Sequence, residues 1–129
     1  MDYNKVNELN PGTEKLTIVY NLMGLLYMNE KKYTEALDNF NKAIGLQPAF
    51  AEAINNRGSL LISQGKYEEA IRDFSTAIEF RSDYAEAYFN RGIAEINSGK
   101  KDAGCADWQR AASLGYQPAT DAYKNNQCH

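Results

Sequence analysis

The chain has 129 residues, of which 43% are hydrophobic and 24% charged, and its formal net charge is −3. This length suits one domain, and the acidic balance leaves no surplus of cations for a nucleic-acid backbone. The single histidine is the last residue, His129, so one chain cannot build a histidine-oriented nucleophile or a two-histidine metal site. We therefore expect no enzyme, no cofactor and no nucleic-acid partner.

Residues 1–16 form a short segment before the main pattern begins. Tyr3, Val6 and Leu9 are spaced by three, which predicts a short amphipathic helix that the following Pro-Gly pair ends. The segment lacks the basic region, apolar core and cleavage site of a secretion signal. We expect this helix to cover the one that follows.

The next helix is apolar on almost every side, and such helices are buried all round. At roughly a dozen residues it is too short to span a membrane, which takes about 20. Two interpretations remain: the preceding helix covers it, or another chain does, as in a homodimer. The apolar residues are Leu16, Ile18, Val19, Leu22, Met23, Leu25, Leu26 and Met28.

A repeating pattern runs through the rest of the chain, and its clearest mark is the equal spacing of Gly24, Gly58 and Gly92. We call the distance from one of these glycines to the next the repeat interval. Around the central glycine we expect a first helix over residues 51–63 and a second over 67–80, running back antiparallel. A single helical hairpin cannot bury both its faces. The pattern therefore predicts stacked hairpins.

The recurring residues resemble the signature of the tetratricopeptide repeat, in which a glycine, aromatics and alanines occupy fixed places over about 34 positions. Three successive units carry the signature, at residues 17–50, 51–84 and 85–118. The matching residues are Tyr20, Met23, Gly24, Tyr27, Ala36, Phe40, Ala43 and Pro48 in the first unit, Ile54, Gly58, Leu61, Ala70, Phe74 and Ala77 in the second, and Tyr88, Gly92 and Ala111 in the third.

The resemblance implies an all-α fold, a right-handed α-solenoid of three helix–turn–helix units. A short N-terminal helix would precede them, and residues 119–129 would form a C-terminal capping helix that opens at the preceding Gln-Pro pair. The units depart from the signature at five places. Arg57 stands at a small apolar place, Ser82 at the proline place, Glu95 at an aromatic place, Gly104 at the first alanine place and Trp108 at a phenylalanine place.

In this family the first helix of each unit lines a concave groove that takes extended or helical peptide segments. The resemblance thus implies a protein-binding scaffold or adaptor, in which asparagines bond a peptide backbone and apolar residues anchor it. The alternative is an assembly module that self-associates or docks through the apolar first helix. The expected groove residues are Asn21, Leu25, Glu52, Asn55, Asn56, Ser59, Glu86, Phe89, Asn90 and Ile93.

Some family members hold the C-terminal carboxylate of a chaperone with Lys, Arg and Asn side chains in this groove. Only Asn56 matches that clamp, whereas Leu25 replaces an asparagine and Glu86 and Asn90 replace the two cations. Without the cations the clamp has no electrostatic basis. The acidic Glu52 and Glu86 instead favour a neutral or basic ligand.

Cys105 and Cys128 are placed symmetrically about the turn before the last helix, so a disulfide is sterically possible if the two helices pack antiparallel. The alternative is two unrelated thiols, as in a reducing compartment. The segment from Gly104 to Cys128 resembles the closing unit of some bacterial repeat proteins. Free thiols would indicate the cytoplasm, and a disulfide the periplasm or secretion. The two cysteines and His129 are poor ligands for a metal, because a chain end makes a poor cage.

Overall fold

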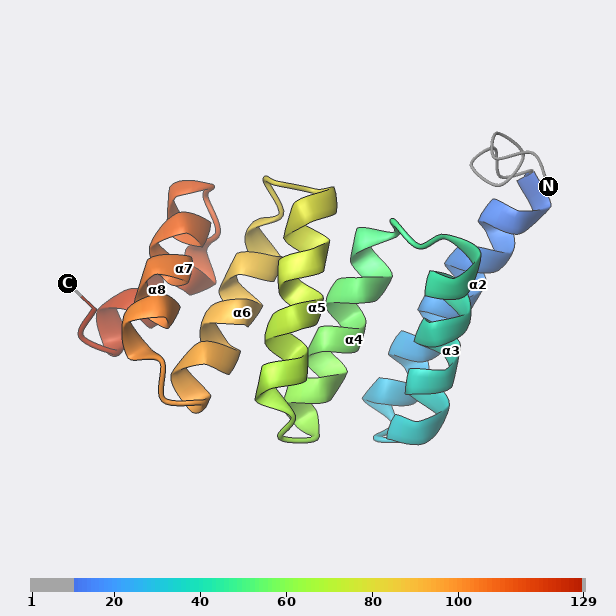
Figure 1. Ribbon diagram of the computed structural model, residues 1–129, viewed down its shortest axis with the longest axis horizontal. Helices are drawn as coiled ribbons and strands as arrows, with labels where there is room; N and C mark the ends of the chain where they lie inside the picture. Colours follow the sequence, from blue (N-terminus) through green and yellow to red (C-terminus); the bar gives the residue numbers. More distant parts are fainter. Residues whose placement is uncertain (1–10, 129) are drawn as a thin grey trace.

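The computed structural model describes residues 11–128, and every regular element in this range is an α-helix. The helices follow one another along the long axis of the molecule, from α2 at one end to α8 at the other (Figure 1). The all-α solenoid predicted from the sequence is confirmed. The helices, labelled as in Figure 1, are α2 (Pro11–Asn29), α3 (Tyr33–Leu46), α4 (Ala51–Ser63), α5 (Tyr67–Phe80), α6 (Ala85–Asn97), α7 (Lys101–Ser113) and α8 (Gln117–Asn125).

The N-terminal boundary differs from the prediction. The expected helix over Tyr3–Leu9 lies outside the described residues. The Pro-Gly pair was expected to end a helix, but α2 begins at Pro11 and is 19 residues long, so residues 11–16 form its first turns. Proline suits this place, because the N–H that it lacks would have no acceptor within the first turn.

In each hairpin, a glycine of the first helix faces an aromatic ring of the second helix. A Cβ atom added to Gly58 of α4 would lie 2.6 Å from Cε1 of Phe74 on α5. Phe74 is fully buried, so the ring has no room to retreat. Gly24 faces Phe40 in the same way, and Gly92 faces Trp108. The helices of each hairpin can therefore approach closely only because these glycines lack a side chain.

The turns inside the hairpins use a left-handed residue after the first helix. Gly65 and Gly99 have φ angles of 74° and 87°, and the N–H of the next residue donates back to a carbonyl of the last helical turn. This is the Schellman arrangement, in which glycine is preferred. In the first hairpin the same place is held by Lys31, with a φ of 63°.

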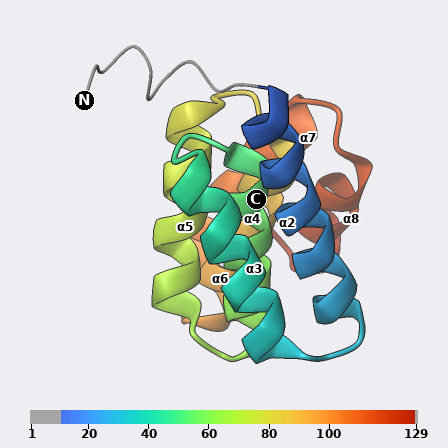
Figure 2. The ribbon, with the colours of Figure 1, turned by 90° about the vertical axis from the view of Figure 1, so that its right-hand side faces the viewer.

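Neighbouring hairpins bury their contact faces against each other. Ala53 and Leu60 on α4, and Ala87 and Ala94 on α6, are completely buried. One apolar cluster joins Leu60 with residues of α3, and another joins α4, α5 and α6. The core is therefore a series of layers between neighbours, as in repeat proteins. Seen from its N-terminal end, the stack shows α2 and α3 in front (Figure 2).

Candidate functional site

The helices α2, α4 and α6, which are the first helices of the three hairpins, carry all the predicted groove residues. We call the side on which these residues lie the first-helix face. A pocket of about 460 Å³ lies beside the turn between α2 and α3. Leu25 was predicted to lie in the groove, and it lines this pocket. The lining residues are Leu25, Met28, Asn29, Lys31, Tyr33 and Ser63.

The asparagines of the first-helix face are bonded to one another between helices. Asn56 Nδ2 donates to Asn21 Oδ1 at 2.9 Å. Asn90 Nδ2 donates to Asn55 Oδ1 at 3.2 Å and to Ser59 Oγ at 3.4 Å. In both asparagine pairs the partners are 35 residues apart, so each pair ties one first helix to the next.

Two of the four asparagines that were predicted to lie open in the groove, Asn21 and Asn55, are buried, whereas Asn56 and Asn90 are half-buried. Asn55 is 1% exposed and Asn21 is 8% exposed, so neither side chain can meet a ligand directly. Nδ2 of Asn55 is buried and makes no hydrogen bond within the described residues. The physical reason is that adjacent first helices lie close enough for one amide to satisfy the next.

The two acids on this face differ in their surroundings. Glu52 Oε1 accepts a hydrogen bond of 2.8 Å from Arg81 Nη1, so its charge is compensated. Glu86 is exposed, and no cation among residues 11–128 forms an ion pair with it. A free carboxylate therefore remains on α6.

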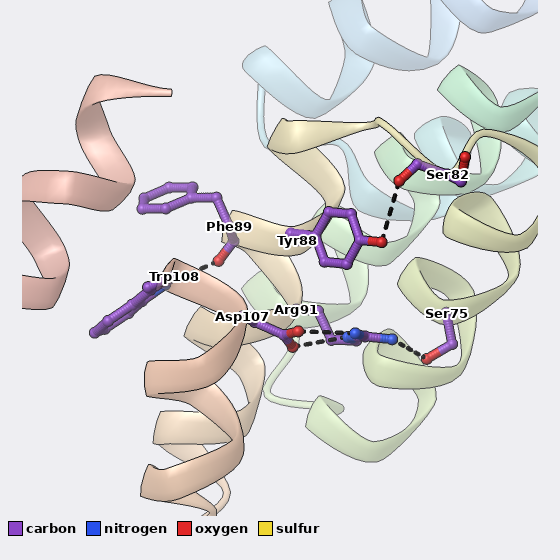
Figure 3. A network of polar contacts seen from close by, with 7 residues as sticks. All are labelled: Ser75, Ser82, Tyr88, Phe89, Arg91, Asp107 and Trp108. Carbon is purple, nitrogen blue, oxygen red and sulfur yellow. Dashed lines mark hydrogen bonds and ion pairs between the residues drawn. The ribbon is translucent and has the colours of Figure 1, made fainter. Parts of the chain in front are cut away.

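Phe89 was predicted to point into the groove, but its ring packs against the C-terminal cap. The ring lies 5.3 Å from that of Tyr116 and 6.4 Å from that of Trp108, centroid to centroid. Trp108 Nε1 also donates to the Phe89 carbonyl at 3.1 Å (Figure 3). Ile93 packs against the same cluster. The residues of α7 and of the turn before α8 cover this part of α6, and the helical spacing within α6 gave no sign of that cover.

Two ion pairs, which sequence reasoning missed, join the two helices of a hairpin. Arg57 makes two hydrogen bonds of 2.8 Å to the carboxylate of Asp73. Arg91 makes the same pair with Asp107, at 2.7 and 2.8 Å (Figure 3). The sequence could have predicted these pairs, because both the arginines and the aspartates recur at the repeat interval.

Glu95, at the place where the second unit has Leu61, is a buried acid. It is 9% exposed, and its Oε1 makes no hydrogen bond within the described residues. Burial, together with the hydrogen bond and charge of Asp107, raises the pKa of Glu95 to about 8. Near neutral pH this side chain therefore carries a proton in the folded state.

The last helix is tied to the third hairpin. It begins at Gln117, where the Gln-Pro pair was expected to open it, and ends at Asn125. Cys105 of α7 and Cys128, after α8, form a disulfide with their Cα atoms 5.5 Å apart. Cys128 is buried in the cluster that contains Trp108. Since the two sulfur atoms bond each other, they are not metal ligands in this state, and His129 lies outside the described residues.

No helix among residues 11–128 is long and apolar enough to cross a membrane. The stacked hairpins and their glycine–aromatic contacts define the class as a helical-repeat solenoid.

Comparison with known proteins assigns the family. The tetratricopeptide repeat model matches residues 18–50, and a TPR repeat model matches residues 58–99. The chain belongs to the tetratricopeptide repeat family. No curated protein sequence matches it significantly.

Solved structures show the same fold. The first TPR of Spaghetti (RPAP3), bound to the HSP90 peptide SRMEEVD, is 26% identical, with a TM-score of 0.80 over 86% of this chain and 90% of that one. The second TPR domain of human RPAP3, in complex with the HSP70 peptide SGPTIEEVD, is 25% identical, with a TM-score of 0.82 over 91% and 99%. The Arabidopsis OM64 TPR domain, at 20% identity and a TM-score of 0.79 over 88% and 98%, supports the fold alone.

Proposed function

We propose that this protein is a non-enzymatic interaction module that binds a peptide or helical segment of a partner protein on the first-helix face. Two structural relatives, the RPAP3 domains, were solved with peptides of HSP90 and HSP70. The observations that carry the proposal are the pocket lined by Leu25 and Met28 near the C-terminal end of α2 and the unpaired carboxylate of Glu86 in the first turn of α6. Apolar anchoring with a few polar groups is the usual composition of a peptide site.

The ligand is neutral or basic. Asn90 Nδ2 donates to two neighbouring side chains and Asn56 Nδ2 to one, whereas the carboxylate of Glu86 is an unpaired acceptor. A face that offers mainly acceptors selects a ligand with many donors, such as a segment that contains lysine or arginine.

The peptides bound by the two RPAP3 domains both end in the acidic sequence EEVD. In this chain Glu86 and Asn90 stand where the family's carboxylate clamp has cations, and Leu25 stands where it has an asparagine. A carboxylate would meet the like charge of Glu86 there. The proposed partner therefore differs from a chaperone tail.

Selection from a displayed library of random peptides on the immobilised full chain tests the proposal, with affinities of the selected peptides measured by calorimetry. We expect peptides that combine apolar residues with Lys or Arg, and no measurable affinity for SRMEEVD. Glu86→Gln should weaken binding about fivefold, because an exposed ion pair contributes up to about 1 kcal/mol. Met28→Ala should also weaken peptide binding, because Met28 lines the pocket at the other end of the site.

Glu79→Gln is the matched control, because Glu79 is exposed on the second helix α5 and its loss changes the net charge equally. Binding that responds equally to Glu79→Gln and Glu86→Gln would reflect net charge alone and contradict the proposed site. Selection of acidic peptides would contradict the proposed ligand chemistry.

A further inference from the structure

Large apolar side chains are exposed on one helix of this molecule. Of the seven large hydrophobic residues that are exposed in the described part of the chain, six lie on α2 and one, Phe80, on α5. Their exposed fractions on α2 range from 38% to 58%. A patch of this kind marks an interaction surface. The six residues are Leu16, Ile18, Val19, Leu22, Met23 and Leu26.

The repeat interval indicates what this surface is shaped to receive. Val19 corresponds to Ala53, which is completely buried, and Leu26 corresponds to Leu60, which is buried against α3 of the preceding hairpin. On α2 this side has no preceding hairpin among the described residues, and it lies at the end of the stack (Figure 2). The surface is thus a stacking side that suits a helix.

The opposite end of the solenoid does not offer a matching surface. The helix α8 carries exposed polar and charged residues, among them Gln117, Asp121 and Lys124. Head-to-tail stacking would place the apolar side of α2 against these groups and would bury charges without partners. The geometry therefore favours contact between two N-terminal ends.

We propose that a second copy of this chain covers the apolar side of α2, with the two α2 helices packed antiparallel. Leu16, Val19, Met23 and Leu26 are spaced by three, four and three residues, the spacing of a coiled-coil seam. A twofold axis near position 21 places Leu16 opposite Leu26 of the partner subunit, and Val19 opposite Met23 of the partner subunit. No charged residue interrupts this seam, so it is complementary to itself.

Sedimentation equilibrium of the full chain over a range of concentrations tests this arrangement. We expect the wild type to be a dimer. Leu16→Glu and Leu26→Lys should each raise the dimer dissociation constant at least tenfold. The double variant Leu16→Glu/Leu26→Lys should regain much of the wild-type affinity, because the antiparallel contact brings each glutamate opposite a lysine of the partner.

Phe80→Glu is the control, because Phe80 is as exposed as the α2 residues but lies on α5. It should leave the dimer intact, and circular dichroism should show unchanged helix content in all four variants. A monomeric wild type at every concentration would overturn the proposal and favour a cover by residues 1–10 or by another protein. Failure of the double variant to regain affinity would overturn the antiparallel pairing. Peptide binding at Glu86 is measured separately and does not depend on this outcome.

Discussion

Arg91 and Asp107 are joined by two parallel hydrogen bonds, from Nε to Oδ2 at 2.7 Å and from Nη2 to Oδ1 at 2.8 Å. The third nitrogen of the guanidinium, Nη1, donates to Ser75 Oγ at 3.1 Å on the preceding hairpin. One arginine thus connects α5, α6 and α7 (Figure 3). Arg57 repeats the arrangement with Asp73 and with Asn41 Oδ1 at 3.0 Å. The contact is therefore part of the repeat, and it joins the hairpin to its neighbour.

Breaking the Arg57–Asp73 pair should destabilise the protein. Arg57→Met should lower the free energy of unfolding by about 3 kcal/mol, because it leaves the carboxylate of Asp73 buried without its partner. The double variant Arg57→Met/Asp73→Asn has the residues that the first unit carries at the same places, Met23 and Asn39. It should therefore lose less stability than the single variant Arg57→Met. Urea unfolding measures both values, and a double variant less stable than the single one would contradict this explanation.

The stability of the protein should fall as the pH rises through the titration of Glu95. The folded-state pKa of about 8 lies above the ordinary value of 4.5, so the folded protein holds this proton more tightly than the unfolded chain does. The stabilisation is complete below about pH 4.5 and is lost by the time the pH passes 8. We expect Glu95→Gln to remove this dependence and to be more stable than the wild type at pH 9, by on the order of 1 to 2 kcal/mol. Urea unfolding at pH 6 and pH 9 measures the free energy of unfolding of both proteins. If this free energy changed equally between the two pH values in the wild type and in Glu95→Gln, the assigned role of Glu95 would be wrong.

Gly58 and Gly45 should respond in opposite ways to a larger side chain. Gly58→Leu forces atoms into the ring of Phe74, and overpacking of this kind costs about 1 to 3 kcal/mol. No atom lies within 4 Å of a Cβ added to Gly45 on α3, so Gly45→Ala should raise the stability by up to about 1 kcal/mol. Thermal unfolding of the two variants tests the hairpin contact. An unchanged melting temperature for Gly58→Leu would show that the helices are not held at this distance.

Lys31→Gly should stabilise the first hairpin. Lys31 has a φ of 63°, a left-handed conformation that is unfavourable for a residue with a Cβ atom. The corresponding residues of the next two hairpins, Gly65 and Gly99, are glycines. After subtraction of the extra freedom that glycine has in the unfolded chain, we expect a gain of about 0.5 to 1 kcal/mol. Chemical denaturation measures the change in the free energy of unfolding. Lys32→Gly, one residue further on, is the control and should not stabilise the protein.

Reduction of the Cys105–Cys128 disulfide should weaken the cap. In the chain-entropy model, a bridge across 23 residues stabilises the folded state by about 3 kcal/mol. The melting temperature should fall when reductant is added to the wild type and should not change for Cys105→Ser/Cys128→Ser. Mass spectrometry of non-reduced native protein should detect no free thiol. Two free thiols in that material would contradict the pairing.

The stacking of helical hairpins could be predicted from the sequence, because the repeat interval places a glycine opposite an aromatic residue and a left-handed residue in each turn. These are local requirements of helix packing and helix ends, and they are visible along a single chain. The helix bounds inside the hairpins followed from the same pattern. The apolar character of α2 was visible as well, because few of its residues could form a polar side.

Which of the groove residues are free depends on how the helices pack in three dimensions. Asn55 and Asn56 are adjacent in sequence, yet one bonds forward to Asn90 and the other back to Asn21, 35 residues away in each case. Phe89 has the helical position of a groove residue, but Tyr116 covers it from the cap. A helical period shows which residues share a face, whereas the distance between neighbouring helices decides whether a side chain on that face meets solvent or another side chain.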